Sequence, residues 1–262
     1  MGFILSCATT PIRIDKLVNI IPLIKCRYKY FVINICNEYK RFGKFKIPKE
    51  LLLLCKRDKR IVFNFIDDYG PICKYIGGFR FIKKKRLTED KLIIIDDDIQ
   101  YKSDLFYELM EYKSKNNITT GSGFNFKNQA YYGTTGECDV VEGYAGICFD
   151  YNQSSDFLEW YIQFYKHFDF KSDNLIDKYL SACFLGDDYI ISDMYKDKWA
   201  IGGGRSLLEV YDYGLLDDAL QNNNIFGNNL KSYAFLFDNS KIIKTFKLKY
   251  KLNKEINEIN IL

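Results

Sequence analysis

Short apolar runs recur along the first hundred residues, and polar or turn-forming residues follow each of them. The runs are rich in β-branched and aromatic side chains and nearly continuous in hydrophobicity, at residues 3–6, 30–36, 60–65 and 91–95. This pattern is typical of strands in a parallel sheet, because such a sheet is covered on both faces. We therefore predict four sheet strands in this part of the chain.

Between and after these runs, apolar residues recur with the period of a helix. Ile14, Leu17 and Ile21 mark one helix, which Pro22 must bend or end. Ser103 is predicted to cap a second helix, and a third is predicted at about 156–167. Because strands and helices alternate over roughly the first 115 residues, the pattern predicts an α/β fold.

The second half of the chain is richer in Gly, Asn and Asp, and its predicted strands are shorter, apart from one at 140–150. No repeat or low-complexity linker separates it from the first half. We therefore expect a single fused domain over 1–240, made of halves at 1–115 and 116–240, followed by a tail at 241–262.

Composition narrows the chemistry. Of 262 residues, 47% are hydrophobic and 27% charged, as in globular proteins, and a net charge of +4 is too balanced for a dedicated nucleic-acid binder. The single histidine, His167, excludes HExxH zinc sites, so we expect carboxylates to perform any catalysis. The 17% aromatic content, with abundant Ile, Lys and Asn, suggests an AT-rich genome such as that of a large DNA virus or a protist.

The cysteines and the N-terminus bear on where the protein is found. None of the eight cysteines forms a CxxC pair, so neither a zinc ribbon nor a thioredoxin-like site is predicted. We expect free thiols and a reducing, cytoplasmic location. Gly2 with Ser6 fits the myristoylation pattern, although a buried first strand is the preferred interpretation. No stretch approaches the ~20 apolar residues of a transmembrane helix.

Three adjacent aspartates, Asp96, Asp97 and Asp98, follow the apolar run at 91–95. Ligands of open α/β sheets collect at the carboxyl ends of strands, and adjacent carboxylates repel one another unless a cation balances them. Mg²⁺ or Mn²⁺ is the natural partner and could bridge a diphosphate. Alternatively, the aspartates cap the next turn and helix. A haloacid-dehalogenase motif is disfavoured because Gln100 stands at its Thr/Val position.

The strand followed by Asp96-x-Asp98 resembles the DxD motif of GT-A-fold glycosyltransferases, which use nucleotide-sugar donors. Other segments resemble parts of these enzymes in the same order, namely their nucleotide-binding turn, a D-x-G-P-x-x-K segment, the floor of the sugar pocket and a late acidic motif, at 6–13, 67–74, 138–146 and 186–192. The resemblance covers about residues 3–235. It implies a Rossmann-like, mostly parallel sheet flanked by helices, with a smaller mixed sheet on the acceptor side.

The resemblance also implies an activity. The half at 1–115 would bind a nucleotide sugar, namely a UDP-sugar, and the half at 116–240 would bind a glycan or protein acceptor. Asp98 and Asp96 would hold Mn²⁺ or Mg²⁺, and Asp96 would also contact the ribose or the donor sugar. Five other polar residues in the segments that resemble the family would also contact the nucleotide or its phosphates, namely Thr9, Arg13, Asp68, Lys74 and Asp97.

The late acidic motif would supply the base of an inverting transfer. Asp188 would take the proton from the acceptor hydroxyl, while Asp187 would orient or bind the acceptor. Glu142, Tyr144 and Gly146 would line the sugar and acceptor pocket. In a retaining enzyme the late acid would only hold the sugar, and the pair is equally compatible with an ordinary helix N-terminus.

Two other functions stay open at this point. A sugar-phosphate nucleotidyltransferase shares the sheet and the metal, but its G-x-x-x-R-L signature is absent after the first strand. A non-catalytic binding protein with this fold is the other alternative. It stays open because residues 217–229 lack the late histidine that many GT-A enzymes use as an additional metal ligand.

Overall fold

The structure is a computed structural model that describes residues 2–44, 46–88, 90–113, 117–125, 135–153, 169, 172–202 and 208–209. The chain divides into two units, Met1–Ser154 with Asp187–Leu215, and Ser155–Gly186 with Leu216–Leu262. The described part of the second unit contains the helix α6 (Leu175–Leu185), capped by Asn174. The predicted helix at 156–167, with His167, and the tail at 241–262 lie outside the described residues. The single domain and its division at residue 115 stay predictions.

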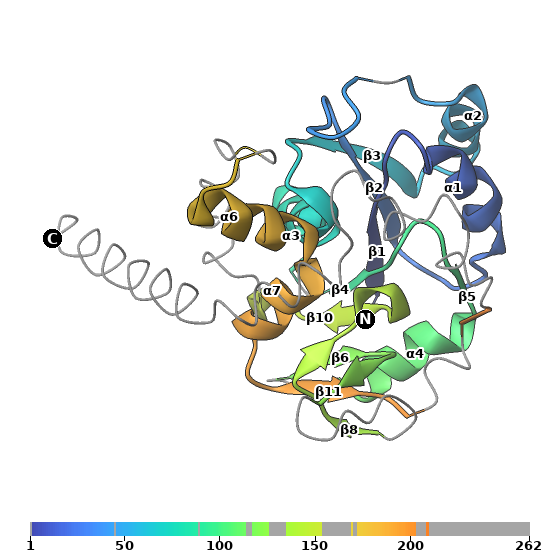
Figure 1. Cartoon of the computed structure of the whole chain (residues 1–262). Helices are drawn as coiled ribbons and strands as arrows, with labels where there is room; N and C mark the ends of the chain where they lie inside the picture. The colour runs from blue at the N-terminus through green and yellow to red at the C-terminus, as the bar shows by residue number, and fades with distance from the viewer. Residues whose placement is uncertain are drawn as a thin grey trace, which may run out of the picture. The chain divides into compact units, whose positions relative to one another are not determined.

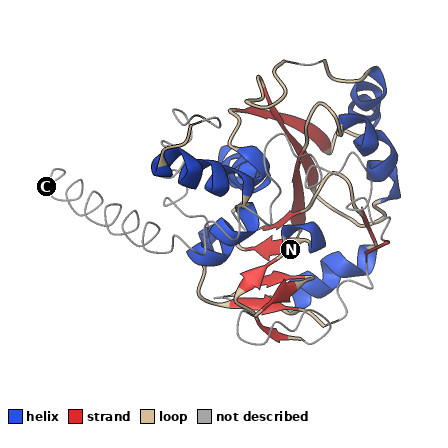
Figure 2. Ribbon diagram, in the orientation of Figure 1, coloured by secondary structure: helices blue, strands red, loops and turns tan. Residues whose placement is uncertain are grey.

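The first unit is built on one eight-stranded sheet (Figures 1 and 2). Its strand order is β3-β2-β1-β4-β10-β6-β11-β8. The first four strands run parallel, β10 is antiparallel to both neighbours, β11 is parallel to β6, and β8 is antiparallel. The bounds are β1 (Phe3–Ala8), β2 (Tyr30–Cys36), β3 (Ile61–Ile66), β4 (Lys91–Ile94), β6 (Ile118–Thr120), β8 (Gly136–Glu137), β10 (Ile147–Phe149) and β11 (Lys198–Ala200).

The predicted α/β class, with a mostly parallel sheet flanked by helices, is thus confirmed. Two separate two-stranded antiparallel sheets accompany the main one. The first pairs β5 (Gln100–Tyr101) with β12 (Leu208–Glu209), and the second pairs β7 (Gly123–Phe124) with β9 (Val140–Val141). The helices and 3₁₀ turns of this unit are α1 (Ile14–Ile20), η1 (Ile21–Leu23), α2 (Lys49–Arg57), η2 (Gly70–Ile72), α3 (Cys73–Lys85), α4 (Ser103–Glu111), η3 (Gly143–Ala145), η4 (Tyr151–Gln153) and α7 (Asp187–Met194).

Two local predictions are wrong. Ser103 is the first residue of α4, and its side chain makes no capping hydrogen bond; the preceding residue, Lys102, occupies the cap position. The strand predicted at 140–150 is interrupted, because η3 separates β9 from β10 and Gly146 takes a left-handed φ of 80°. Pro22, as predicted, ends α1, and the chain tightens into η1 around it.

The two faces of the parallel strands are covered differently. Residues 3, 5 and 7 of β1, with their counterparts on β2 and β4, join residues of α1, α2 and α4 in a buried apolar cluster. On the opposite face α3 contacts β1 and β2, and there the strands contribute polar residues. The Asn34 amide donates to Ser6 Oγ at 2.8 Å, and Ser6 Oγ donates to the Lys74 carbonyl at 2.6 Å.

Two glycines let α3 approach the sheet closely. A Cβ on Gly77 would lie 1.8 Å from Asn34 Oδ1, and one on Gly78 would lie 2.7 Å from the Leu92 side chain. Real Cβ atoms do not approach other atoms this closely, so a side chain at either position would force Asn34, Leu92 or the helix itself to move. Lys74, one turn earlier on α3, is consequently held beside the end of the sheet. In the described part of the chain, no helix has the length and apolar character needed to cross a membrane.

Candidate active site

The acidic triplet stands just beyond the carboxyl end of β4, as predicted. A tyrosine fixes this turn, because the Asp96 amide donates to Tyr101 Oη at 2.9 Å and Tyr101 Oη donates to the Tyr144 carbonyl at 2.7 Å. Tyr101 is 2% exposed, so these bonds form away from solvent and hold the triplet against η3. Tyr101 was not among the residues predicted to form the site.

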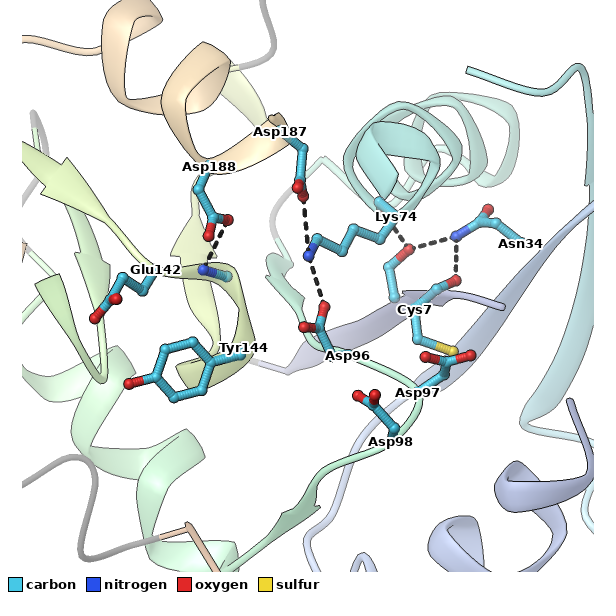
Figure 3. Close-up of polar contacts among 12 residues, drawn as sticks. Cys7, Asn34, Lys74, Asp96, Asp97, Asp98, Glu142, Tyr144, Asp187 and Asp188 are labelled. Atoms are coloured by element: carbon cyan, nitrogen blue, oxygen red, sulfur yellow. Dashed lines mark hydrogen bonds and ion pairs between the residues drawn. The ribbon is translucent and has the colours of Figure 1, made fainter. Parts of the chain in front are cut away.

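Lys74 joins the two acidic motifs (Figure 3). Its ammonium lies 2.6 Å from Asp96 Oδ1 and 2.9 Å from Asp187 Oδ2. The lysine side chain is 5% exposed, and Asp187, the first residue of α7, is similarly buried. Three elements that are distant in the chain, namely α3, the end of β4 and the start of α7, therefore converge on one buried cation.

Arg13 makes the corresponding bridge within the triplet. Its guanidinium pairs with Asp97 Oδ1 at 2.8 Å and with Asp98 Oδ2 at 2.6 Å. The Asp97 side chain is fully buried, whereas Asp98 is 14% exposed. The predicted triplet and the predicted cation are thus in direct contact, through a residue that stands just before α1.

Asp188 is held by backbone and side-chain hydrogen bonds. Its Oδ1 accepts from the Gly143 amide at 2.8 Å, and its carbonyl accepts from Ser192 Oγ at 2.6 Å. The Val141 amide in turn donates to Ser192 Oγ at 2.9 Å. A Cβ on Gly143 would lie 2.6 Å from Asp188 Oδ1 and 2.8 Å from the Lys74 ammonium nitrogen, so this glycine leaves the room that both side chains use.

Burial and neighbouring charges shift the pKa values of the acids in different directions. Burial raises the pKa of Asp188 well above its usual range, and neighbouring Asp187 raises it further. Burial also raises the pKa of Asp187, and that of Asp97 to about 6, in the latter case with the help of Asp98. Burial acts the same way on Asp96, but the attraction of Lys74 and its hydrogen bond outweigh it and lower the pKa.

The residues predicted to line the sugar and acceptor pocket surround η3. Glu142 accepts from Ser122 Oγ at 2.5 Å, and Tyr144 Oη donates to the same hydroxyl at 3.2 Å. In Figure 3 their polar ends point away from Lys74. Gly146, with its left-handed backbone, ends the turn into β10 and offers a ligand only backbone atoms.

Thr9 and Asp68, both predicted to contact the nucleotide, make different contacts in the structure. The buried Thr9 hydroxyl has no hydrogen-bond partner among the described residues, but it lies near enough to Asp97 to offset part of the rise in the pKa of that acid. Asp68 accepts from the Lys40 amide at 2.7 Å and from the Gly70 amide at 2.9 Å. Among the described residues, no hydrogen bond or ion pair joins Asp68 to the triplet or to Lys74.

The exposed acids have the donor atoms that a hard divalent cation needs. Asp96 and Asp98 are the two members of the triplet whose side chains reach solvent, at 27% and 14% exposure. Each uses one carboxylate oxygen for its basic partner, and within the described part of the chain the other oxygen has no recorded contact. Carboxylate oxygens are the preferred ligands of Mg²⁺ and Mn²⁺, so these two residues fit such an ion.

Among known proteins, the matches to this chain are solved structures. No family model and no curated protein matches the chain. Two matching solved structures are an active-site mutant of LgtC and the galactosyltransferase LgtC in complex with donor and acceptor sugar analogs. The first is 12% identical, with a TM-score of 0.42 over 76% of this chain and 71% of that one. The second is 13% identical, with a TM-score of 0.37 over 62% and 64%.

Proposed function

We propose that this protein is a glycosyltransferase that moves a sugar from a nucleotide-sugar donor, a UDP-sugar, to a hydroxyl group of a glycan or protein acceptor. The supporting observation is that the acidic triplet and the late acidic pair meet on Lys74, 2.6 Å from Asp96 and 2.9 Å from Asp187. This meeting point lies at the carboxyl edge of the parallel strands, where open α/β sheets bind ligands.

The donor diphosphate would lie at the acidic triplet. Asp98 and Asp96 would hold Mn²⁺ or Mg²⁺, and such an ion, when bound, neutralises the diphosphate and makes it a better leaving group. Arg13 and Thr9 stand beside Asp97 and Asp98 and would orient the nucleotide. Lys74 has three N–H groups, one of which donates to Asp96 while Asp187 is an ion-pair partner, so an N–H group would remain for an oxygen of the nucleotide sugar.

Asp188 is the proposed base for an inverting transfer. Its carboxylate would take the acceptor hydroxyl proton while that oxygen bonds to the anomeric carbon and the bond from that carbon to the diphosphate oxygen breaks. A raised pKa suits this task, because a base with a pKa nearer the working pH accepts a proton more readily. Asp187 is buried against Lys74, so we assign it to positioning the lysine rather than to the acceptor.

The experiment is a nucleotide-release assay with UDP-sugars, with and without Mn²⁺ and a mixture of simple glycan acceptors. The wild type should release UDP in a metal-dependent reaction that acceptor stimulates. Asp96→Asn and Asp98→Asn together should reduce this rate by about 10³-fold or more, because a preorganised electrostatic contact alone contributes about 10²–10³.

Asp150→Asn is the matched control, since Asp150 also pairs with lysines but stands at the opposite end of β4. It should keep the wild-type rate at a temperature where the variant is folded. Normal turnover in the double variant would overturn the proposal. Pyrophosphate release from UTP and a sugar phosphate would indicate a nucleotidyltransferase instead, and UDP binding without turnover would indicate a binding protein.

A further inference from the structure

A second cluster of metal-ligating atoms lies outside the site described above. It consists of Cys36 at the end of β2, Asp68 in the turn after β3, and Cys73 at the start of α3. Their sulfur and carboxylate ligand atoms all lie within 4.8 Å of one another, and no other group of three His, Cys, Asp or Glu in the described part of the chain does so. We call these three residues the thiol cluster.

The spacing of the thiol cluster suits a tetrahedral metal. The two sulfur atoms lie 4.0 Å apart. Two Zn–S bonds of about 2.3 Å at the tetrahedral angle would place the sulfurs about 3.8 Å apart, so binding requires a shift of only a few tenths of an ångström. Both cysteines are at least 97% buried, whereas Asp68 is partly exposed, so solvent reaches the cluster from the Asp68 side.

Backbone amides already hold two of the three side chains in place. The Tyr69 amide donates to Cys73 Sγ at 3.3 Å, and such N–H groups stabilise a thiolate. Amides of Lys40 and Gly70 donate to the two oxygens of Asp68, each of which keeps a second lone pair for a metal. Metal sites use outer contacts of this kind to orient their ligands.

Charge balance is compatible with a bound cation. A divalent ion with two thiolates and one carboxylate carries a net charge of −1. Arg41 is close enough for the charges of Asp68 and Cys36 to act on its guanidinium, so it can compensate this charge. The ligand set differs from that of the acidic triplet, because thiolates select zinc-like ions whereas carboxylates alone select Mg²⁺ or Mn²⁺.

We infer that the thiol cluster is a Zn²⁺ site, with Cys36, Cys73 and Asp68 as ligands and a solvent molecule in the fourth position. Binding deprotonates both thiols, and the protons leave to the buffer without any oxidation. The ion would tie the ends of β2 and β3 to the first residue of α3. Because Lys74 follows Cys73 directly, the metal would also fix the lysine that joins the two acidic motifs.

The experiment uses the full chain, stripped of metal under reducing conditions and titrated with Co²⁺ and then Zn²⁺ in excess Mg²⁺. One equivalent of Co²⁺ should produce thiolate-to-cobalt charge-transfer absorption, which Zn²⁺ should then abolish. Zn²⁺ should raise the melting temperature and release about two protons per ion, measured by calorimetry in buffers of different ionisation enthalpy. Absence of the absorption in the wild type would overturn the inference.

Variants locate the site. Cys36→Ala and Cys73→Ala should each lose the cobalt absorption, whereas Cys26→Ala, which removes an equally buried lone thiol, should keep it. Asp96→Asn with Asp98→Asn should also keep it, so this test does not depend on the glycosyltransferase proposal. Retention of the absorption in folded Cys36→Ala would contradict the inference. So would a Cys36–Cys73 disulfide found by peptide mapping of the unreduced wild type, because that bond would occupy the position of the metal.

Discussion

The two ends of β4 hold ion-pair clusters of opposite kinds. At the amino end, Asp150 accepts from two lysines, Lys91 at 2.8 Å and Lys113 at 2.9 Å. At the carboxyl end, the cations Lys74 and Arg13 face the carboxylates of the two acidic motifs, Asp96, Asp97, Asp98, Asp187 and Asp188. One end has enough cations for its acid, whereas the other has more acids than cations.

This difference separates a structural cluster from a candidate active site. The pKa of Asp150 is lowered, because the hydrogen bonds from Lys91 and Lys113 outweigh the effect of burial. At the other end burial and mutual repulsion raise the pKa values of Asp97, Asp187 and Asp188. Excess buried negative charge costs stability, and a bound cation would relieve that cost.

The largest expected effect is on the proposed base. Asp188→Asn should lower kcat by about 10²–10⁴-fold and leave UDP binding intact, because an amide cannot accept the proton. In the wild type the rate should rise with pH, since the base must lose its own proton, with a midpoint above the usual aspartate range. A pH–rate profile checks both points, and an unchanged acidic limb in Asp188→Asn would reject this residue as the base.

Removing one lysine from each ion-pair cluster compares how much the two ends of β4 contribute to stability. Lys74→Met removes the partner of both Asp96 and Asp187, and leaving buried charge unpaired typically costs about 3–5 kcal/mol. Lys113→Met should cost less, because Asp150 keeps Lys91. Urea unfolding of the two variants measures the difference. Equal losses would show that the two clusters do not differ in the way proposed.

A third test displaces Asp188 and Lys74 without removing a charge. In Gly143→Ala the new methyl group would meet Asp188 Oδ1 and the Lys74 ammonium, which must both shift. Because a displacement of about 1 Å can cost about 10²-fold in rate, we expect a loss of that order in kcat. Gly136→Ala is a suitable control, since no atom lies within 4 Å of its new methyl group. Equal rates in the two variants would contradict the prediction.

The smallest effects concern stability against pH, where the two ends should differ in sign. Asp97, with a raised pKa of about 6, stabilises the fold below its usual pKa of about 4, and this contribution is lost as the pH rises through 6. Asp150, with a lowered pKa, stabilises the fold above its usual pKa, and that contribution is lost on acidification.

Melting temperatures from pH 4 to 7 in metal-free buffer test this difference. Asp97→Asn should reduce the loss of stability between pH 4 and 6, by about 1–3 kcal/mol at most, because the amide has no proton to lose. Asp150→Asn should instead lower stability most at pH 7. The same pH dependence in both variants would remove the distinction between the two ends.

The sheet could be predicted from the sequence because β1, β2 and β4 are almost entirely buried and therefore appear as nearly continuous apolar runs. The interruption of the strand expected at 140–150 could not be predicted from the sequence. The β-branched residues and glycines there have the pattern of one strand, but η3 and the left-handed Gly146 divide the segment in two. Local turn geometry of this kind depends on contacts that hydrophobic periodicity does not report.

The candidate site was predictable only in part. The acidic motifs were visible as residue types after apolar runs, but the position of Lys74 between Asp96 and Asp187 depends on how closely α3 approaches the sheet. No pattern in the sequence indicated the thiol cluster. Cys36 and Cys73 come from different elements and follow no metal-ligand spacing, so only the fold brings them together.

The glycine pair of α3 has a consequence for finding relatives of this protein. Lys74, Gly77 and Gly78 form a Lys-x-x-Gly-Gly motif. The lysine is needed to pair with both Asp96 and Asp187, and the two glycines are needed because a Cβ at either position would come too close to a neighbouring side chain. Diverged sequences that retain little overall identity should keep this motif between their third and fourth strands. A search that weights the motif and the number of residues between it and the acidic triplet would select homologues by how the lysine is positioned rather than by overall similarity.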